Sequence, residues 1–328
     1  AEEANTWKLL HCLHADSINE HPESLDDLIT ETTLSQKTLV SALFRSDSEL
    51  RLLQLLVDWL EATAAYQEEI TKTSAPIIGN NIHWSNTLHQ LLIGDSLFNK
   101  DKNKAMVTCM DPDAPRRQKK TIHSDDQKDD NDLCKRIFTE IRCGKFKEAV
   151  SLCLSAGQAW RGAVLQGWIL LHYLPREDEN SPLEISGNPS RDLWKWCALG
   201  LANNVEENMY YRATVGILSG HLPSALLVCQ GSWEDLLWSH LKIQIEARVD
   251  KYLREHHATA EANTTPDDVL ELLQSELQVE EISLTQIFNA VKSLMNGKRE
   301  SQYQICQRYM MLGKIRAIMQ DSLEWIDN

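Results

Sequence analysis

The sequence predicts an all-α protein, an irregular α-solenoid of stacked antiparallel helix pairs. Apolar residues recur three and four positions apart through most of the 328 residues, which is the spacing of one helix face. The chain has only 13 glycines, fewer than a β-sandwich with many tight turns would use. One helix–turn–helix pattern also occurs twice, as stacked helix pairs would produce. We therefore expect helices throughout and almost no β-structure.

Residues 1–98 are predicted to form an N-terminal helical block. Its strongest pattern lies over 47–66, and Asp47 or Ser46 can cap the start of that helix. The apolar residues there alternate three and four apart, as in a helix that packs along another helix, and they are Leu50, Leu53, Val57, Leu60 and Ala64. Shorter helices are expected over 6–13, 25–29, 34–44 and 84–98.

Residues 99–132 carry dense charge and few apolar side chains. A segment of this composition cannot bury enough apolar surface to offset the entropy lost on ordering. We expect a charged, flexible loop between two helical blocks.

Residues 133–255 are predicted to form a central helical block rich in tryptophan. Over 145–173 we expect two amphipathic helices, the first ending at Gly157 in a left-handed conformation. On the second helix the small residues Ala163 and Gly167 alternate with Trp160 and Trp168, so a neighbouring helix can approach closely. A surface loop is expected over 174–190, and helices over 192–203, 206–219, 223–229 and 233–254.

The central block contains an internal repeat. Gly144, Phe146, Ala149, Val150, Cys153 and Trp160 are matched, in the same order, by Gly220, Leu222, Ala225, Leu226, Cys229 and Trp233. Such an echo is typical of stacked helix pairs. Two degenerate copies are weak evidence alone, because any helical hairpin can reuse glycine, alanine and tryptophan at these places.

Residues 256–328 are predicted to form a C-terminal helical block. One stripe consists of Ile287, Phe288, Val291 and Leu294, and Gly297 follows its end. Two further helices are expected over 298–325, with a break near Gly313. The three blocks are expected to form one continuous solenoid, a fragment of a longer protein.

Charge and cysteine usage bound the functional class. The net charge is −15, which argues against nucleic acid as a general partner and favours basic protein partners. Eight cysteines are scattered without a CxxC pair, which indicates a reducing compartment, cytosol or nucleus. No apolar run is long enough to cross a bilayer, so direct membrane insertion is not expected.

The sequence nominates no reaction centre. His11, Cys12 and His14 are the nearest thing to a metal cluster, but a structural zinc site needs four converging ligands. No phosphate-binding loop and no nucleophile elbow is present. We predict no catalytic residue, no cofactor, no metal and no small-molecule substrate. One or two of the ten tryptophans could anchor a protein interface.

A basic cluster leaves one alternative function open. Arg116, Arg117, Lys119 and Lys120 could contact nucleic acid or chromatin. Acidic residues follow directly and would weaken phosphate contacts: Asp125, Asp126, Asp129, Asp130 and Asp132. A flexible linker of balanced charge is the simpler interpretation.

Four motifs between residues 111 and 238 resemble the 107-kDa nucleoporin family. The first is Asp111, Pro112, Asp113, Ala114 and Pro115, which looks like a linker of that family. The others comprise Cys153, Gly157, Trp160, Arg161, Ala163, Gly167 and Trp168, then Tyr211 to Leu222, and finally Cys229, Trp233 and Trp238. Residues 1–110 and 239–328 fit by helical character and order.

The resemblance implies a J- or U-shaped helical stack of the ancestral coatomer type without enzymatic activity. It implies a scaffold of the outer-ring Y complex in the nuclear pore complex, at the nuclear envelope of the nucleus, that supports pore assembly, nucleocytoplasmic transport and mRNA export. The implied partners are the 96-kDa nucleoporin through this region, and the 133-kDa nucleoporin through a C-terminal part expected to lie beyond it. Which residues form the partner interface is not implied.

Overall fold

The computed structural model describes residues 2–18, 35–71, 84–93, 106–173, 184–257, 280–295 and 297–326. Within these ranges the chain forms fifteen α-helices and one antiparallel ribbon of two-residue strands, so the all-α prediction is confirmed. The elements are α1 (Glu2–Ile18), α2 (Gln36–Ser46), α3 (Ser48–Thr71), α4 (Ser85–Ile93), α5 (Ala114–Gln118), α6 (Ser124–Arg142), α7 (Phe146–Ser155), α8 (Ala159–Gln166), β1 (His172–Tyr173), β2 (Ile185–Ser186), α9 (Arg191–Asn203), α10 (Met209–Ser219), α11 (Leu222–Cys229), α12 (Trp233–His257), α14 (Leu284–Leu294), α15 (Gln302–Met311) and α16 (Ile315–Ile326).

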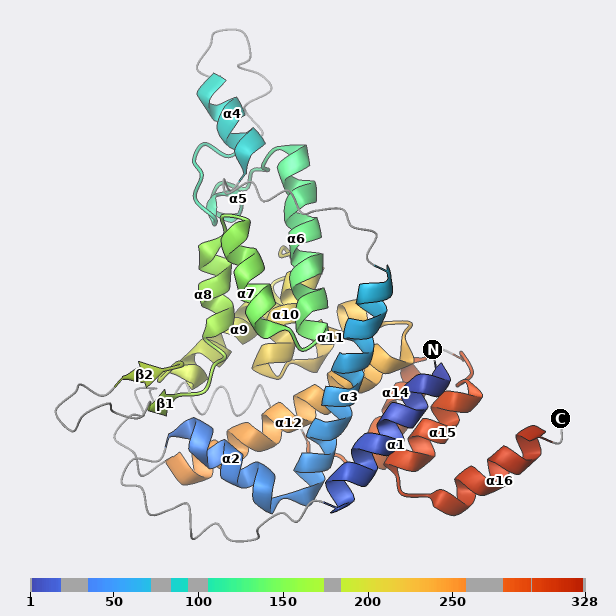
Figure 1. Cartoon of the computed structure of the whole chain (residues 1–328). Helices are drawn as coiled ribbons and strands as arrows, with labels where there is room; N and C mark the ends of the chain where they lie inside the picture. Colours follow the sequence, from blue (N-terminus) through green and yellow to red (C-terminus); the bar gives the residue numbers. More distant parts are fainter. Residues whose placement is uncertain are drawn as a thin grey trace.

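The helices form two parts that meet at an angle (Figure 1). Helices α6, α7 and α8 stand together as a column, with α4 at its far end. Helices α1, α2, α3, α12, α14 and α15 form a base, and α16 lies at the outer edge of that base. Helices α9, α10 and α11 lie where the column meets the base, and α10 packs against both α6 and α12.

The chain folds back on itself, so that helices from its two ends lie side by side. Helix α12 packs against α3 and α2, and α15 packs against α1. The Nε2 of Gln307 donates a buried hydrogen bond of 2.9 Å to the Oγ1 of Thr6, which is 301 positions earlier. The Ser301 hydroxyl lies 3.1 Å from the Glu2 carboxylate. The base is therefore closed by contacts between α1, the first described helix, and α15 near the other end of the chain.

Local sequence sets the ends of several helices. Asp47 caps α3 as expected, because its carboxylate accepts a hydrogen bond from the backbone N–H of Leu50 at 2.9 Å. Ser283 and Ser301 begin α14 and α15 with capping boxes, in which a glutamine three positions later bonds back to the serine N–H.

One apolar core runs through column and base. It extends from Leu9 on α1 to Met311 on α15 and includes the predicted stripe of α3 except Ala64, which is half-buried. Leu50, Val57 and Leu60 of that stripe are fully buried. Burying each such side chain stabilises the fold by roughly 1.5–3 kcal/mol, so this shared core holds the two parts together.

The two copies of the internal repeat have matching geometry. Gly144 and Gly220 both take positive φ, +71° and +91°, between one helix and the next. Cys153 and Cys229 occupy equivalent buried positions, at 0% and 1% exposure. Each copy is a helix pair, α6–α7 and α10–α11, whose members pack on each other.

Four buried charges join α9 to α12. Arg191 and Lys195 on α9 face Glu246 and Asp250 on α12. Arg191 lies 2.7 Å from Glu246 and 2.5 Å from Asp250, and Lys195 lies 2.9 Å from Glu246 and also contacts Asp250. Burial alone would raise the pKa of Asp250, but Lys195 and Arg191 lower it to about 2.

The charged segment 99–132 differs from the expected loop wherever the structure describes it. Helix α5 and the start of α6 lie between residues 106 and 132. Asp126 accepts hydrogen bonds of 2.6 Å from both the backbone N–H and the hydroxyl of Thr87, and one of 3.2 Å from the N–H of Asn86. This carboxylate thus caps the start of α4, which orders the segment. Residues 99–105 lie outside the described residues.

The second helix of the Trp-rich pair is shorter than predicted. Helix α8 ends at Gln166, because the N–H groups of Gly167 and Trp168 turn back to carbonyls three residues earlier, which tightens the helix end. Trp168 then turns toward α12, where its indole N–H donates to Glu246 at 3.0 Å. Ala163, expected on the packed face, is exposed. The predicted division into blocks at 98, 132 and 255 stays a prediction.

Candidate interaction surface

The motif residues of the first helix pair lie mainly inside the column. Cys153 is fully buried, and Gly157 takes φ +72° at the turn after α7. Arg161 is buried and forms two bonds to Asp130, at 2.9 and 3.1 Å, while its guanidinium lies over the rings of Trp160 and Tyr211. Burial opposes the charge, but Cys134 and Asp130 hold the Arg161 pKa above its usual range. This arrangement ties α8 to α6 and α10.

Gly167 and Trp168 pack toward the neighbouring helices α9 and α12. Gly167 leaves no room for a side chain, because the indole of Trp194 fills the space beside its Cα. The indole N–H of Trp194 donates to the carbonyl of Val164 at 2.7 Å. The sequence therefore indicated a close helix approach at the correct glycine.

The motif residues of the second pair lie in the joint between column and base. Cys229, Trp233 and Trp238 are buried, and Gly220 forms the preceding turn. The indole of Trp233 stacks on Phe288 and donates to Glu300 at 3.2 Å. Trp238 donates to Glu61 at 3.0 Å. These tryptophans are packing residues, and none of them offers a surface to a partner.

The linker motif forms a small ordered unit near the far end of the column. Ala114 is fully buried with Trp84, Val107 and Ile122. The remaining motif residues are Asp111, Pro112, Asp113 and Pro115, and the two aspartates lie 2.9 and 3.2 Å from the guanidinium of Arg117. Arg117, one of the four basic residues of the cluster, is thus paired with Asp111 and Asp113 of the same unit.

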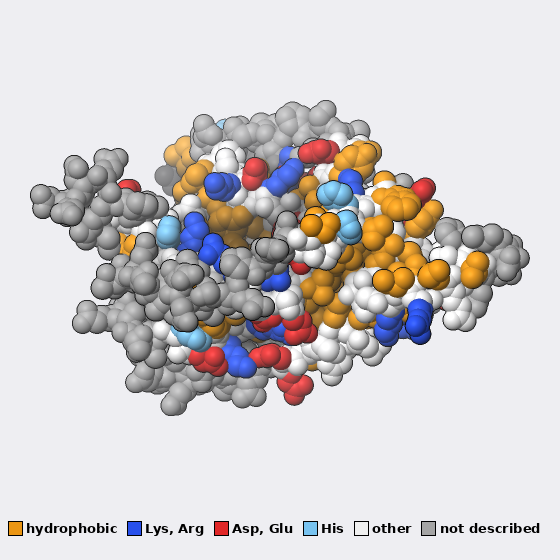
Figure 2. Space-filling model, turned by 60° about the horizontal axis from the view of Figure 1, so that its bottom comes forward, with side chains coloured by type: hydrophobic (Ala, Val, Ile, Leu, Met, Phe, Trp, Pro, Cys, Tyr) orange, Lys and Arg blue, Asp and Glu red, His pale blue; other side chains and the backbone are white. Residues whose placement is uncertain are grey.

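The described residues show a different exposed feature on the base. Trp7 on α1 is 63% exposed, although indoles are usually buried. On one side of Trp7 lies a groove between α1, α15 and α16; on the other lies a hollow between α1 and α3. Hydrophobic side chains gather on the half of the underside where these helices lie (Figure 2). We name the first of these hollows the α1–α16 groove.

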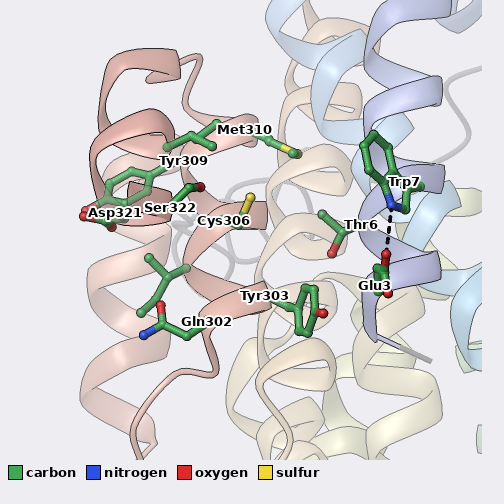
Figure 3. Close-up of a pocket in the computed structure, with 12 residues that line it drawn as sticks. Glu3, Thr6, Trp7, Gln302, Tyr303, Cys306, Tyr309, Met310, Asp321 and Ser322 are labelled. Carbon is green, nitrogen blue, oxygen red and sulfur yellow. Dashed lines mark hydrogen bonds between the residues drawn. The ribbon is translucent and has the colours of Figure 1, made fainter. Parts of the chain in front are cut away.

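Helix α1 supplies one wall of the α1–α16 groove, and α15 and α16 supply the rest. Figure 3 shows Thr6 and Trp7 facing the side chains of Tyr303, Cys306 and Met310 across the space. Burial raises the pKa of the Cys306 thiol, which lines the groove. Helix α16 carries an exposed stripe at spacing i, i+4, i+8: Ile315, Met319 and Leu323, each at least 63% exposed.

The sequence reasoning did not single out this surface. The clustering of tryptophans in 145–238 drew attention there instead, where Trp233 and Trp238 are buried, three others are half-buried and Trp196 is exposed. Helix α1 has apolar residues on more than one face, and this pattern could have identified Trp7. Leu9 lies in the core, whereas Trp7 and Leu10 lie toward solvent, at 63% and 40% exposure. A helix with a second apolar stripe outside its core face indicates another contact.

The structure offers little for chemistry in the ranges it describes. No group of three or more His, Cys, Asp or Glu side chains there is placed to hold a metal ion, and His11 and Cys12 line the hollow beside α3 instead. In the same ranges, none of the helices is long and apolar enough to cross a membrane.

Comparison with known proteins gives a consistent result. The family model described as Nuclear pore protein 84 / 107 matches residues 1–328. The chain is 36% identical to Nuclear pore complex protein Nup107 of Drosophila melanogaster and 34% identical to that of Homo sapiens, in each case over 99% of this chain and over 39% and 35% of those proteins. Nucleoporin nup107 of Schizosaccharomyces pombe is 27% identical over 81% of this chain and 32% of its own length.

These relatives are named as nucleoporins or nuclear pore complex proteins, and the chain spans well under half of their length. The match covers both copies of the Trp-containing repeat, the linker motif and the base. The helical architecture, the buried motif residues and the match over the whole chain agree, and the chain belongs to the Nuclear pore protein 84 / 107 family.

Proposed function

We propose that this chain is a non-catalytic scaffold segment of the outer-ring Y complex of the nuclear pore complex, at the nuclear envelope. In this role it binds other helical nucleoporins and thereby supports pore assembly, nucleocytoplasmic transport and mRNA export. The observation that carries the proposal is the apolar core from Leu9 to Met311, which column and base share, in a chain that a nuclear pore family model matches over residues 1–328.

The proposed partner of this region is the 96-kDa nucleoporin. A stiff helical body presents long faces at fixed angles, and apolar contact along such faces gives a stable complex that salt weakens little. The proposed site for the 133-kDa nucleoporin lies in a C-terminal part of the full-length protein.

Reconstitution tests the proposal. The chain and the 96-kDa nucleoporin are mixed, and the mass of the product is measured by size exclusion with light scattering at 0.1 and 0.5 M salt. We expect a stoichiometric complex at both concentrations. A helical-repeat protein from outside the pore serves as the control partner. A mixture that elutes as two separate components, or a complex that 0.5 M salt dissociates, would contradict the proposal.

The alternative, a nucleic-acid or chromatin adaptor, gains no support from the geometry. Arg117 is bound by Asp111 and Asp113, and the next helix begins with the acids Asp125 and Asp126. Replacing Arg116, Arg117, Lys119 and Lys120 by alanine tests it. Loss of retention on DNA at low salt would favour the adaptor, and unchanged retention would exclude it.

A further inference from the structure

The α1–α16 groove has the form of a docking site for one helix. Its walls are α1 and α16, and α15 lies between them (Figure 3). The lining is mainly apolar or aromatic: Trp7, Tyr303, Ile305, Cys306, Tyr309, Met310 and Ile318. Helix α15 lines the groove from Gln302 to Met310, which is about 12 Å of helix, so the groove accommodates roughly two turns of a partner helix.

Trp7 is placed as the anchor for such a partner. Its indole lines both the α1–α16 groove and the hollow beside α3, so a helix lying along α1 would cover it from either side. Its N–H has one weak bond, 3.5 Å to the Glu3 carboxylate, which leaves the ring face open. Tryptophan residues of this kind contribute most of the affinity at many interfaces, because covering the ring removes a large apolar area from water.

The charge at the groove indicates the sign of the partner. Glu3 on α1 and Asp321 on α16 line it, and among the described lining residues there is no Lys, Arg or His. The hollow on the other side of Trp7 is lined by both signs of charge, with Asp16 and Asp58 as well as Lys8 and His11. The chain as a whole has a net charge of −15. An acidic rim around an apolar floor is complementary to a basic amphipathic segment.

The mode of binding follows from the elements present. In the described part of the chain the strands are two residues long and lie at β1–β2, so an extended peptide would find no sheet edge beside Trp7 to join. A groove between parallel ridges of side chains accommodates an amphipathic helix, which inserts residues at spacing i, i+3, i+4 and i+7.

We propose that the α1–α16 groove binds an amphipathic helix of a partner protein, with an apolar stripe that covers Trp7 and flanking Lys or Arg residues that face Glu3 and Asp321. The inference goes beyond the proposed scaffold function, because it names a surface and a partner chemistry that binding of the 96-kDa nucleoporin does not require. The two can fail separately, since their experiments use different ligands.

The first experiment measures peptide binding. A synthetic amphipathic peptide of roughly fifteen residues, with apolar positions at i, i+3, i+4 and i+7 and lysines on both flanks, is labelled and titrated with the chain by fluorescence anisotropy. Its twin carries glutamates in place of the lysines. We expect the basic peptide to bind about tenfold more tightly than the twin at low salt, and the ratio to fall as salt rises. Equal affinity for both peptides would overturn the proposal.

Variants locate the binding site. Trp7→Ala is expected to weaken binding of the basic peptide about thirtyfold, and the exposed side chain can be removed without opening the core. The matched control is Trp196→Ala on α9, because Trp196 is 41% exposed and distant from the groove lining. An equal effect of both variants, or an undiminished affinity of Trp7→Ala, would overturn the assignment. Thermal unfolding of each variant shows that the fold is retained.

Charge reversal tests the rim independently of Trp7. The double variant Glu3→Lys and Asp321→Lys is expected to reverse the preference, so that the acidic twin binds more tightly than the basic peptide. A control with Glu148→Lys and Glu206→Lys makes the same change in net charge on exposed residues outside the groove lining, and should keep the original preference.

A second copy of this chain is the competing occupant. Light scattering over a range of concentrations measures self-association of the wild-type chain and of Trp7→Ala. We expect a monomer in both cases. A dimer that Trp7→Ala dissociates would show that the groove is covered by another copy, and would overturn the proposed partner.

Discussion

At the residue scale, a single glycine sets how closely α8 and α9 approach. Gly167 has φ −61° and ψ −17°, a conformation that alanine adopts freely, so backbone strain is not the reason for glycine here. The reason is space, because a Cβ at this position would lie 2.1 Å from the Cδ1 of Trp194. The indole cannot withdraw without losing its bond to Val164.

Gly167→Ala is therefore expected to lower the free energy of unfolding by about 1–3 kcal/mol, as overpacked cores do. Gly200 in α9 is the matched control, since nothing lies within 4 Å of a Cβ built there. Gly200→Ala should raise stability by about 0.4–1 kcal/mol, because alanine has less chain entropy to lose. Urea unfolding followed by circular dichroism measures both. The same sign for the two substitutions would contradict the steric explanation.

At the element scale, the buried charges between α9 and α12 act as a unit. Lys195 is fully buried and contacts both Glu246 and Asp250. Removing its charge leaves two carboxylates against the single cation of Arg191, in a place where water cannot solvate the excess charge.

Lys195→Met is expected to lower the free energy of unfolding by about 3–5 kcal/mol. The double variant Lys195→Met with Asp250→Asn removes one charge of each sign and should cost less than the single variant. Lys251 on α12 is the control, since its ammonium group pairs with Glu281 at 2.7 Å but its side chain is 60% exposed. Lys251→Met should leave the urea midpoint close to that of the wild-type chain, because water already solvates this exposed pair. Urea midpoints distinguish these outcomes, and a double variant less stable than Lys195→Met would refute the account.

The elements also show what the sequence could and could not predict. Local patterns located the α3 stripe, its cap at Asp47 and the repeated glycine turns at 144 and 220, because each depends on residues close together in the chain. The order in 106–132 was missed because it depends on a distant partner: Asp126 is held by Thr87, 39 positions away. Asp126 lies in the first turn of α6, but the sequence analysis assigned it to the charged loop.

At the scale of the whole molecule, the fold-back of the chain was beyond sequence reasoning. Periodicity shows which face of α1 is apolar, but not that α15 covers part of that face and leaves Trp7 outside. The candidate surface is thus a product of tertiary arrangement. The buried motif residues were identified by pattern and resemblance, and the structure places most of them in the shared core instead of at a surface.

Buried cysteines of the folded molecule also determine how its stability responds to alkaline pH. Burial raises the pKa of the thiols of Cys134 and Cys229 from 9.0 to about 12, and that of Cys153 to about 11. In the unfolded chain these thiols lose their protons near pH 9, whereas in the folded chain they keep them. Above pH 9 the unfolded state therefore binds fewer protons, and the free energy of unfolding falls as pH rises toward the folded pKa values.

Each of these thiols is expected to lower the free energy of unfolding by up to about 1.4 kcal/mol per pH unit in this interval. Urea unfolding at pH 7.5, 9, 10 and 11 measures the slope. The control is a variant with alanine at 134, 153 and 229. Its cavities make it less stable at pH 7.5, but its slope above pH 9 should be shallower, because the three titrating groups are gone. Tyrosine and lysine contribute equally to both chains, so identical slopes would show that these cysteines are not buried in the folded chain in solution.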